Sequence, residues 1–214
     1  MKDEKFSWQL FKMAPIIGIV RSISFEAVKE ILPVYYDAGL TTIEITMNTL
    51  EADEIIAYAS KEYRGRLNVG AGTVCTQEDL DKAISAGASF IVTPIIKKKI
   101  IRACVKNDIP IFPGAYTPSE IYKAWSLGAS MVKVFPATNL GPDYIKDVKA
   151  PLTDVKLVPT GGVNLENIAS FFKAGADGAG IGSYLLHKQF IRDKNWAALK
   201  DHFTKFLKQL EPVI

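Results

Sequence analysis

A strand–helix unit repeats along this chain, and the repeat restricts the folds open to it. Residues typical of helix ends recur every 20–26 positions, and each precedes an apolar strand and a loop with Gly, Pro or Thr. They are Gly39, Gly65, Gly87, Asn107, Gly128, Asp154 and Gly175. Strands that alternate with helices pair in parallel, so about eight such units predict an α/β fold, a (β/α)8 TIM barrel.

The repeat predicts one barrel domain over residues 1–214, preceded by a short N-terminal helix at residues 4–13. The expected strands are residues 16–20, 42–46, 68–73, 89–93, 109–112, 131–136, 156–159 and 178–182. The expected helices are residues 24–37, 50–63, 76–86, 96–106, 118–127, 141–150, 164–174 and 194–209. An open doubly wound sheet is the alternative, but no G-x-G-x-x-G opens a helix after the first strand.

The composition of the chain indicates which class of ligand it binds and in which cellular compartment we expect it. Hydrophobic residues make up 48% of the chain and the formal charge is +3, which suits a small anionic substrate and argues against nucleic acid. Cys75 and Cys104 have no paired spacing, so we expect a reducing compartment. The N-terminus lacks the apolar core of a signal peptide and no run is long enough to span a bilayer. We therefore expect a cytoplasmic protein.

Lys133 lies inside an apolar strand, and lysine is seldom buried there without a use. Burial disfavours the ammonium form and lowers the pKa of a lysine. A neutral amine attacks ketones and forms Schiff bases. The alternative is that Lys133 lies at a strand end with its amine in water.

Glu44 occupies a matching position in an earlier strand. If Ile43 and Ile45 face the surrounding helices, Glu44 faces the barrel axis, as Lys133 does between Val132 and Val134. The two charges could therefore approach one another. Glu44 is then either an acid/base group or a structural partner that offsets the burial of Lys133.

Two glycine-rich stretches follow the last two strands and predict an anion site. The first is Pro159-Thr160-Gly161-Gly162-Val163-Asn164, after the seventh strand, and the second is Gly180-Ile181-Gly182-Ser183, after the eighth. We expect each to open a helix and to present free backbone N–H groups, as in the phosphate sites of barrel enzymes. The alternative is that the glycines only permit tight turns.

Other candidates are weaker. Arg21, at the end of the first strand, could bind an anion or form a salt bridge at the rim, and Thr73 and Thr93 are candidate hydroxyl donors. His187 and His202 stand alone, and we find no cluster with metal-ligand spacing, so we expect neither a metal nor another cofactor.

The ordered segments 42–46 (TIEIT), 69–74 (VGAGTV), 112–114 (FPG), 132–137 (VKVFPA) and 158–163 (VPTGGV) resemble those of one enzyme family. It is the 2-dehydro-3-deoxy-6-phosphogluconate aldolase / 4-hydroxy-2-oxoglutarate aldolase family of class I aldolases. The resemblance runs from Ile16 to about Leu186. It implies a homotrimeric lyase that yields pyruvate in carbohydrate metabolism, in the Entner–Doudoroff pathway.

The resemblance also implies roles for individual residues. Lys133 would form the Schiff base and Glu44 would be the general acid/base. Thr73 would contact the pyruvyl carboxylate, and Pro94 and Phe135 would shape the pocket. The distal phosphate would be held by Thr160, Gly161, Gly162 and Ser183.

One departure concerns the substrate. Family members usually carry Arg-Thr after the strand that holds the glutamate, and that arginine binds the substrate carboxylate; this chain has Asn48-Thr49. Asparagine donates hydrogen bonds but brings no charge. Either Arg21 or another group compensates, or the preferred substrate differs.

These observations predict an aldolase that cleaves a 2-keto-3-deoxy sugar acid phosphate to pyruvate and an aldehyde, such as glyceraldehyde 3-phosphate. Two alternatives stay open. One is a phosphate-binding barrel isomerase or epimerase without a covalent intermediate. The other is an inactive barrel that only binds a sugar acid phosphate.

Overall fold

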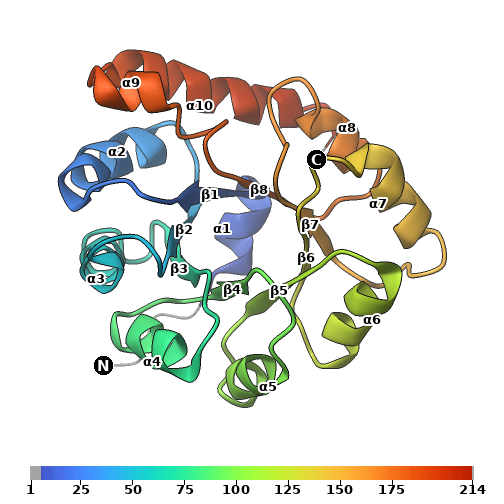
Figure 1. Ribbon diagram of the computed structural model, residues 1–214. Coiled ribbons are helices and arrows are strands. Elements are labelled where there is room, and N and C mark those ends of the chain that lie inside the picture. Colours follow the sequence, from blue (N-terminus) through green and yellow to red (C-terminus); the bar gives the residue numbers. More distant parts are fainter. Residues whose placement is uncertain (1–5, 214) are drawn as a thin grey trace.

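Eight parallel strands form a barrel, and helices surround it (Figure 1). The computed structural model describes residues 6–213. The strands are β1 (Ile16–Val20), β2 (Thr42–Thr46), β3 (Asn68–Gly72), β4 (Ile91–Thr93), β5 (Ile111–Ala115), β6 (Val132–Val134), β7 (Leu157–Pro159) and β8 (Ala179–Ile181). Neighbours in sequence pair in parallel, β8 pairs with β1, and a bridge between Thr160 and Gly180 links β7 to β8. The predicted TIM-barrel architecture is confirmed.

The helices alternate with the strands, as the repeat predicts. They are α1 (Trp8–Met13), α2 (Phe25–Asp37), α3 (Ala52–Glu62), α4 (Gln77–Ser85), α5 (Lys98–Lys106), α6 (Pro118–Ser126), α7 (Gly141–Lys149), α8 (Ile168–Lys173), α9 (Lys188–Arg192) and α10 (Trp196–Leu210). Ser24 caps α2 as predicted, because its hydroxyl accepts a hydrogen bond from the Ala27 N–H. Gly39 ends α2 as predicted, in the left-handed conformation with φ of 93°.

Several element boundaries were wrong. The leading helix begins at Trp8 behind a Ser7 cap, and residues 4 and 5 lie outside the described residues. The fifth strand starts later and runs on through Pro113 and Gly114 to Ala115. The glycine-rich exits of β7 and β8 do not open helices directly, because α8 begins only at Ile168 and a turn separates β8 from α9. Helix α9 was not predicted.

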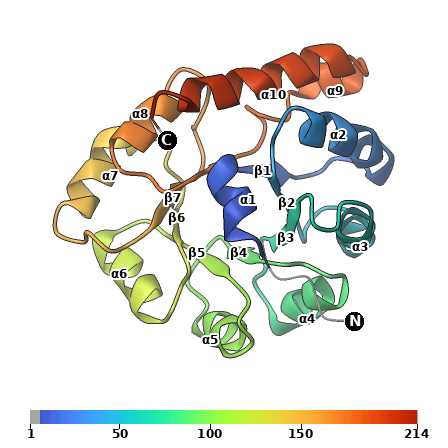
Figure 2. The ribbon, with the colours of Figure 1, turned by 180° about the vertical axis from the view of Figure 1, so that it is seen from behind.

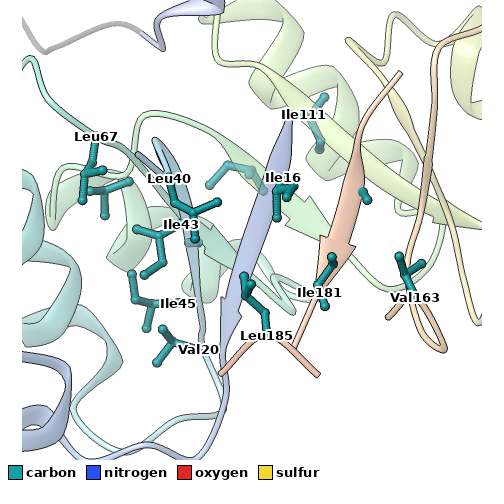
Figure 3. Close-up of a cluster of buried hydrophobic side chains, with 14 of the residues drawn as sticks. Ile16, Val20, Leu40, Ile43, Ile45, Leu67, Ile111, Val163, Ile181 and Leu185 are labelled. Carbon is teal, nitrogen blue, oxygen red and sulfur yellow. The ribbon is translucent and has the colours of Figure 1, made fainter. Parts of the chain in front are cut away.

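Two hydrophobic layers hold the barrel. The outer layer packs the strands against the helices, and it includes Ile43, Ile45, Val132 and Val134 (the two isoleucines are labelled in Figure 3). Because these residues face outward, the intervening Glu44 and Lys133 face inward, as the strand phase predicts.

The inner layer closes the amino-terminal end of the barrel. Helix α1 lies across this end (Figure 2), and Phe6 and Phe11 pack against Phe90, just before β4, and Phe112 of β5. The Asn68 side chain holds the segment in place, since its Oδ1 accepts from the Ser7 N–H at 2.7 Å and its Nδ2 donates to the Ser7 carbonyl at 2.9 Å. The N-terminal segment is therefore the floor of the barrel.

We expect Phe11→Ala to lower the free energy of unfolding by about 3–5 kcal/mol, as for a fully buried phenylalanine. Only 1% of Phe11 is exposed. Chemical denaturation measures the change, and Met13→Ala, at a residue 64% exposed, is the control with an effect below about 0.5 kcal/mol. Equal denaturation midpoints for Phe11→Ala and the wild type would show that the floor adds nothing to stability.

Candidate active site

Lys133 and Glu44 lie inside the barrel on strands that are not neighbours. Lys133 pairs in register with Gly114 and Val158, and Glu44 pairs with Ile19 and Gly70. Only 3% of Lys133 and 1% of Glu44 is exposed. The alternative in which the Lys133 amine reaches water from a strand end is therefore wrong.

Glu44 is accommodated by a glycine on the next strand. Its carboxyl group lies over Gly72 so closely that a Cβ at that position would stand 1.7 Å from Oε1. This Oε1 is buried and has no hydrogen-bond partner among the described residues. A buried carboxyl oxygen without a partner is costly and is typical of functional sites.

The amine and the carboxyl group interact without touching. Within the described residues they form no ion pair at 4.0 Å or less, and the Lys133 Nζ lies 4.9 Å from the centroid of the Phe135 ring. Glu44 is thus not a contact partner that neutralises the lysine.

Burial controls the ionisation of both groups. It lowers the pKa of Lys133, while the nearby Glu44 carboxylate raises that pKa and the Arg21 guanidinium lowers it. Burial raises the pKa of Glu44, and Lys133 and Arg21 both lower it. Both shifts favour the uncharged forms, an amine that can act as a nucleophile and a carboxyl group that can give or take a proton.

A cavity of about 800 Å³ opens at the carboxyl ends of β1, β7 and β8. It brings together seven residues predicted for the site. They are Arg21, Phe135, Thr160, Gly161, Gly162, Gly182 and Ser183. Phe135 joins this cavity to the Lys133 amine, because its ring contacts both.

The other three predicted residues do not line this cavity. Thr73 directly follows β3 and has φ of 58°, a strained conformation for a β-branched residue that is found mainly at functional sites. Asn48 is exposed in the turn after β2. Pro94 is half-buried after β4, with its carbonyl oxygen 2.2 Å from where a Cβ on Gly114 would stand. All three follow strands on the mouth side of the barrel.

The weaker candidates Thr93, His187 and His202 can also be placed. The Thr93 hydroxyl donates to the Ile95 carbonyl at 2.6 Å, so that donor is already used. His187 and His202 lie outside the cavity lining and pack against Phe190. Among residues 6–213, no three His, Cys, Asp or Glu side chains are grouped as metal ligands would be, and no helix is long and apolar enough to cross a membrane.

Known proteins share this arrangement. The family profile described as "Aldolase: KDPG and KHG aldolase" matches residues 8–202. The chain belongs to the KDPG and KHG aldolase family. Aldolases are carbon–carbon lyases, so this family member is an enzyme of that class.

The similarity extends over most of the chain. The 2-dehydro-3-deoxy-6-phosphogalactonate aldolase of Escherichia coli (strain K12) is 36% identical over 172 residues, 80% of this chain and 84% of the relative. A native KDPGal structure is 30% identical over 98% of both chains, with a TM-score of 0.88. A KDPG aldolase from Legionella pneumophila, with pyruvate captured as a covalent carbinolamine, is 25% identical over 91% of this chain and 95% of its own, with a TM-score of 0.83.

Three residues of this aldolase family member, Thr49, Lys188 and Arg192, were missed as parts of the site. The Thr49 hydroxyl accepts from the Ser22 N–H at 3.2 Å and lies 3.0 Å from the Thr46 hydroxyl, so it ties the exit of β1 to that of β2. Lys188 and Arg192 of α9 line the cavity. The only sequence signal for these two was their position shortly after Gly182-Ser183.

The charges around Lys133 predict opposite pKa shifts in two variants. Glu44→Gln removes the carboxylate that raises the pKa of Lys133, so that pKa falls; Arg21→Gln removes a charge that lowers it, so that pKa rises. Competitive acetylation of Lys133 against pH, read by peptide mass spectrometry, gives the midpoint for each protein. Midpoints that move in the same direction in both variants would contradict this electrostatic arrangement.

Proposed function

We propose that Lys133 is the Schiff-base lysine and Glu44 the proton carrier of a class I aldolase that cleaves a 2-keto-3-deoxy sugar acid phosphate. The family to which the chain belongs supports the reaction class. One observation carries the assignment of residues. A buried amine and a buried carboxyl group face the axis of the barrel, beside a cavity lined by glycine loops and cations.

The first half of the reaction forms the iminium ion. The neutral Lys133 amine attacks the C2 carbonyl carbon, and one proton passes from the nitrogen to the carbonyl oxygen to give a neutral carbinolamine. Glu44 supplies the proton with which the hydroxyl group leaves as water. The product is a cationic iminium between C2 and Nζ, and Glu44 is left as a carboxylate.

The second half breaks the carbon–carbon bond. The Glu44 carboxylate removes the proton of the C4 hydroxyl, directly or through a water. The C3–C4 electron pair moves into the iminium, which releases an aldehyde and leaves an enamine on Lys133. Protonation of the enamine at C3 and hydrolysis of the imine release pyruvate and restore the amine.

The cavity positions the far end of the substrate. The backbone N–H groups of the β7 and β8 exits and the Ser183 hydroxyl suit a phosphate, and fixing that phosphate holds C4 near the base. At the near end, Thr73 is proposed to bind the carboxylate. Arg21 is proposed to supply the positive charge that the arginine at position 48 supplies in other family members. Its guanidinium is close enough to affect the pKa of both Glu44 and Lys133.

The proposal extends to the setting of the enzyme. We propose a single-domain homotrimer in the cytoplasm that serves the Entner–Doudoroff pathway or a related route of sugar acid breakdown. The family resemblance supports the assembly, and the named relatives act on galactonate- and gluconate-derived substrates. Pyruvate with a panel of phosphorylated and unphosphorylated aldehydes, assayed in the direction of condensation, identifies the aldehyde.

Borohydride reduction in the presence of pyruvate should add the mass of a reduced pyruvyl adduct to Lys133. Lys133→Met, which replaces the amine with an apolar chain of similar length, should remain folded by circular dichroism, acquire no adduct and lose activity. Turnover by wild-type protein with an unmodified Lys133 peptide would instead support an isomerase or epimerase without a covalent intermediate. An adduct without turnover across the aldehyde panel would leave a binding protein.

Glu44→Gln should slow turnover by about two to four orders of magnitude, the usual contribution of an acid/base group. The amide keeps the shape of the side chain over Gly72 but carries no exchangeable carboxyl proton. Steady-state kinetics measures the loss, and thermal unfolding checks that the variant is folded. Normal turnover by a folded Glu44→Gln protein would make Glu44 a structural residue only.

A further inference from the structure

The cavity at the carboxyl ends of β1, β7 and β8 has an unbalanced charge. Its lining contains three cationic side chains, Arg21, Lys188 and Arg192, and no aspartate or glutamate. Backbone N–H groups can bind a weakly charged anion without help from cationic side chains. Three formal positive charges around one cavity of about 800 Å³ suit a ligand with more than one negative charge.

The cations of α9 have no acidic partners that would explain them. Within the described residues, neither Lys188 nor Arg192 forms an ion pair. The nearby acids are engaged elsewhere, since Asp193 accepts from the Gln189 side chain at 2.6 Å and Glu30 accepts from Lys194 at 2.7 Å. These two cations are therefore available to a ligand.

The spacing of the two residues has a cost for the helix. Lys188 and Arg192 are four positions apart, so they lie on one face of α9, and both line the cavity. Like charges at this spacing destabilise a helix. An anionic group of the ligand, bound between Lys188 and Arg192, would offset this repulsion, whereas water would only screen it.

The position of α9 in the barrel fits this role. Both views of the ribbon show α9 beside α2, on the side of the barrel where β1 and β8 pair (Figures 1 and 2). Residues of α9 line the same cavity as Arg21 after β1, Ser183 after β8 and the glycine-rich exit of β7. A ligand held by the exit loops would then be enclosed by cations on its other side.

We infer that Lys188 and Arg192 are the residues that select for a doubly charged distal group, a phosphate monoester, over an uncharged hydroxyl. The inference rests on the proposed function, because it concerns the far end of the same substrate. The glycine loops and Ser183 fix the position of the anion, and the two cations set how much charge it must carry. A phosphate monoester carries about 1.5 to 2 negative charges at neutral pH, and arginine binds it in a bidentate manner.

The test compares two aldehydes that differ only in the distal group, which is a phosphate monoester in one and a hydroxyl in the other. Condensation of pyruvate with D-glyceraldehyde 3-phosphate or with D-glyceraldehyde gives a ratio of kcat/KM values for each protein. We expect that ratio to fall roughly tenfold in Lys188→Gln and in Arg192→Gln, and roughly a hundredfold in the double variant, as for the loss of charged hydrogen bonds. Lys205→Gln/Lys208→Gln is the matched control, because it removes the same charge from α10 outside the cavity lining.

Salt gives a second measurement. In the wild type, KM for the phosphorylated aldehyde should rise with KCl concentration, and in the Lys188→Gln/Arg192→Gln variant the rise should be smaller. Borohydride trapping of pyruvate on wild-type Lys133 is run alongside. No adduct on the wild type overturns the proposed function itself. An adduct together with an unchanged ratio in the double variant, or an equal fall in the α10 control, overturns only the role of Lys188 and Arg192.

Discussion

The structure depends on keeping an amine and a carboxyl group buried in one barrel without letting them pair. In contact, Lys133 and Glu44 would both be stabilised in their charged forms, and the amine would lose its nucleophilicity. The barrel places them on β6 and β2, further apart than an ion pair allows, and Gly72 gives the carboxyl group a place against the β3 backbone. Burial therefore disfavours the charged form of both groups, and their mutual attraction only partly offsets this effect.

That arrangement needs a dry interior, which the outer and inner hydrophobic layers provide. Ile43, Ile45 and the valines beside Lys133 seal the strands against the helices, and the aromatic floor seals the amino-terminal end. The polar end of the cavity is built differently, from backbone groups and charged side chains at the strand exits. In the proposed mechanism, chemistry and anion binding therefore occupy neighbouring regions of opposite character, with Phe135 between them.

Much of this could be predicted from the sequence, because the fold and the key residues depend on local periodicity. Helix-end glycines and apolar runs gave the strand–helix repeat, and alternation within a strand gave the inward direction of Glu44 and Lys133. The end of β5 could not be predicted in this way. Pro113 and Gly114 normally interrupt strands, but here Pro113 pairs with Thr93 and Gly114 with Lys133, and Gly114 leaves room for the Pro94 carbonyl.

Other parts of the site depend on contacts that leave no pattern in the chain. Five residues are too few for α9 to show a helical period, so no periodic pattern pointed to its two cations. The left-handed conformation of Thr73 runs against the preference of a β-branched residue, and the engagement of the Thr93 hydroxyl depends on a turn. Only the folded chain shows which strand exits share a cavity.

The aromatic floor also determines the order in which molecules can pass. Phe6 and Phe11 fill the base, and the cavity lies at the strand exits, so this is the end of the barrel that faces substrate, water and products. In the proposed reaction, the aldehyde is free to leave through the strand exits while the pyruvyl fragment is still bound to Lys133. Its departure leaves room for the water that hydrolyses the imine, so a barrel closed at its base favours release of the aldehyde before pyruvate.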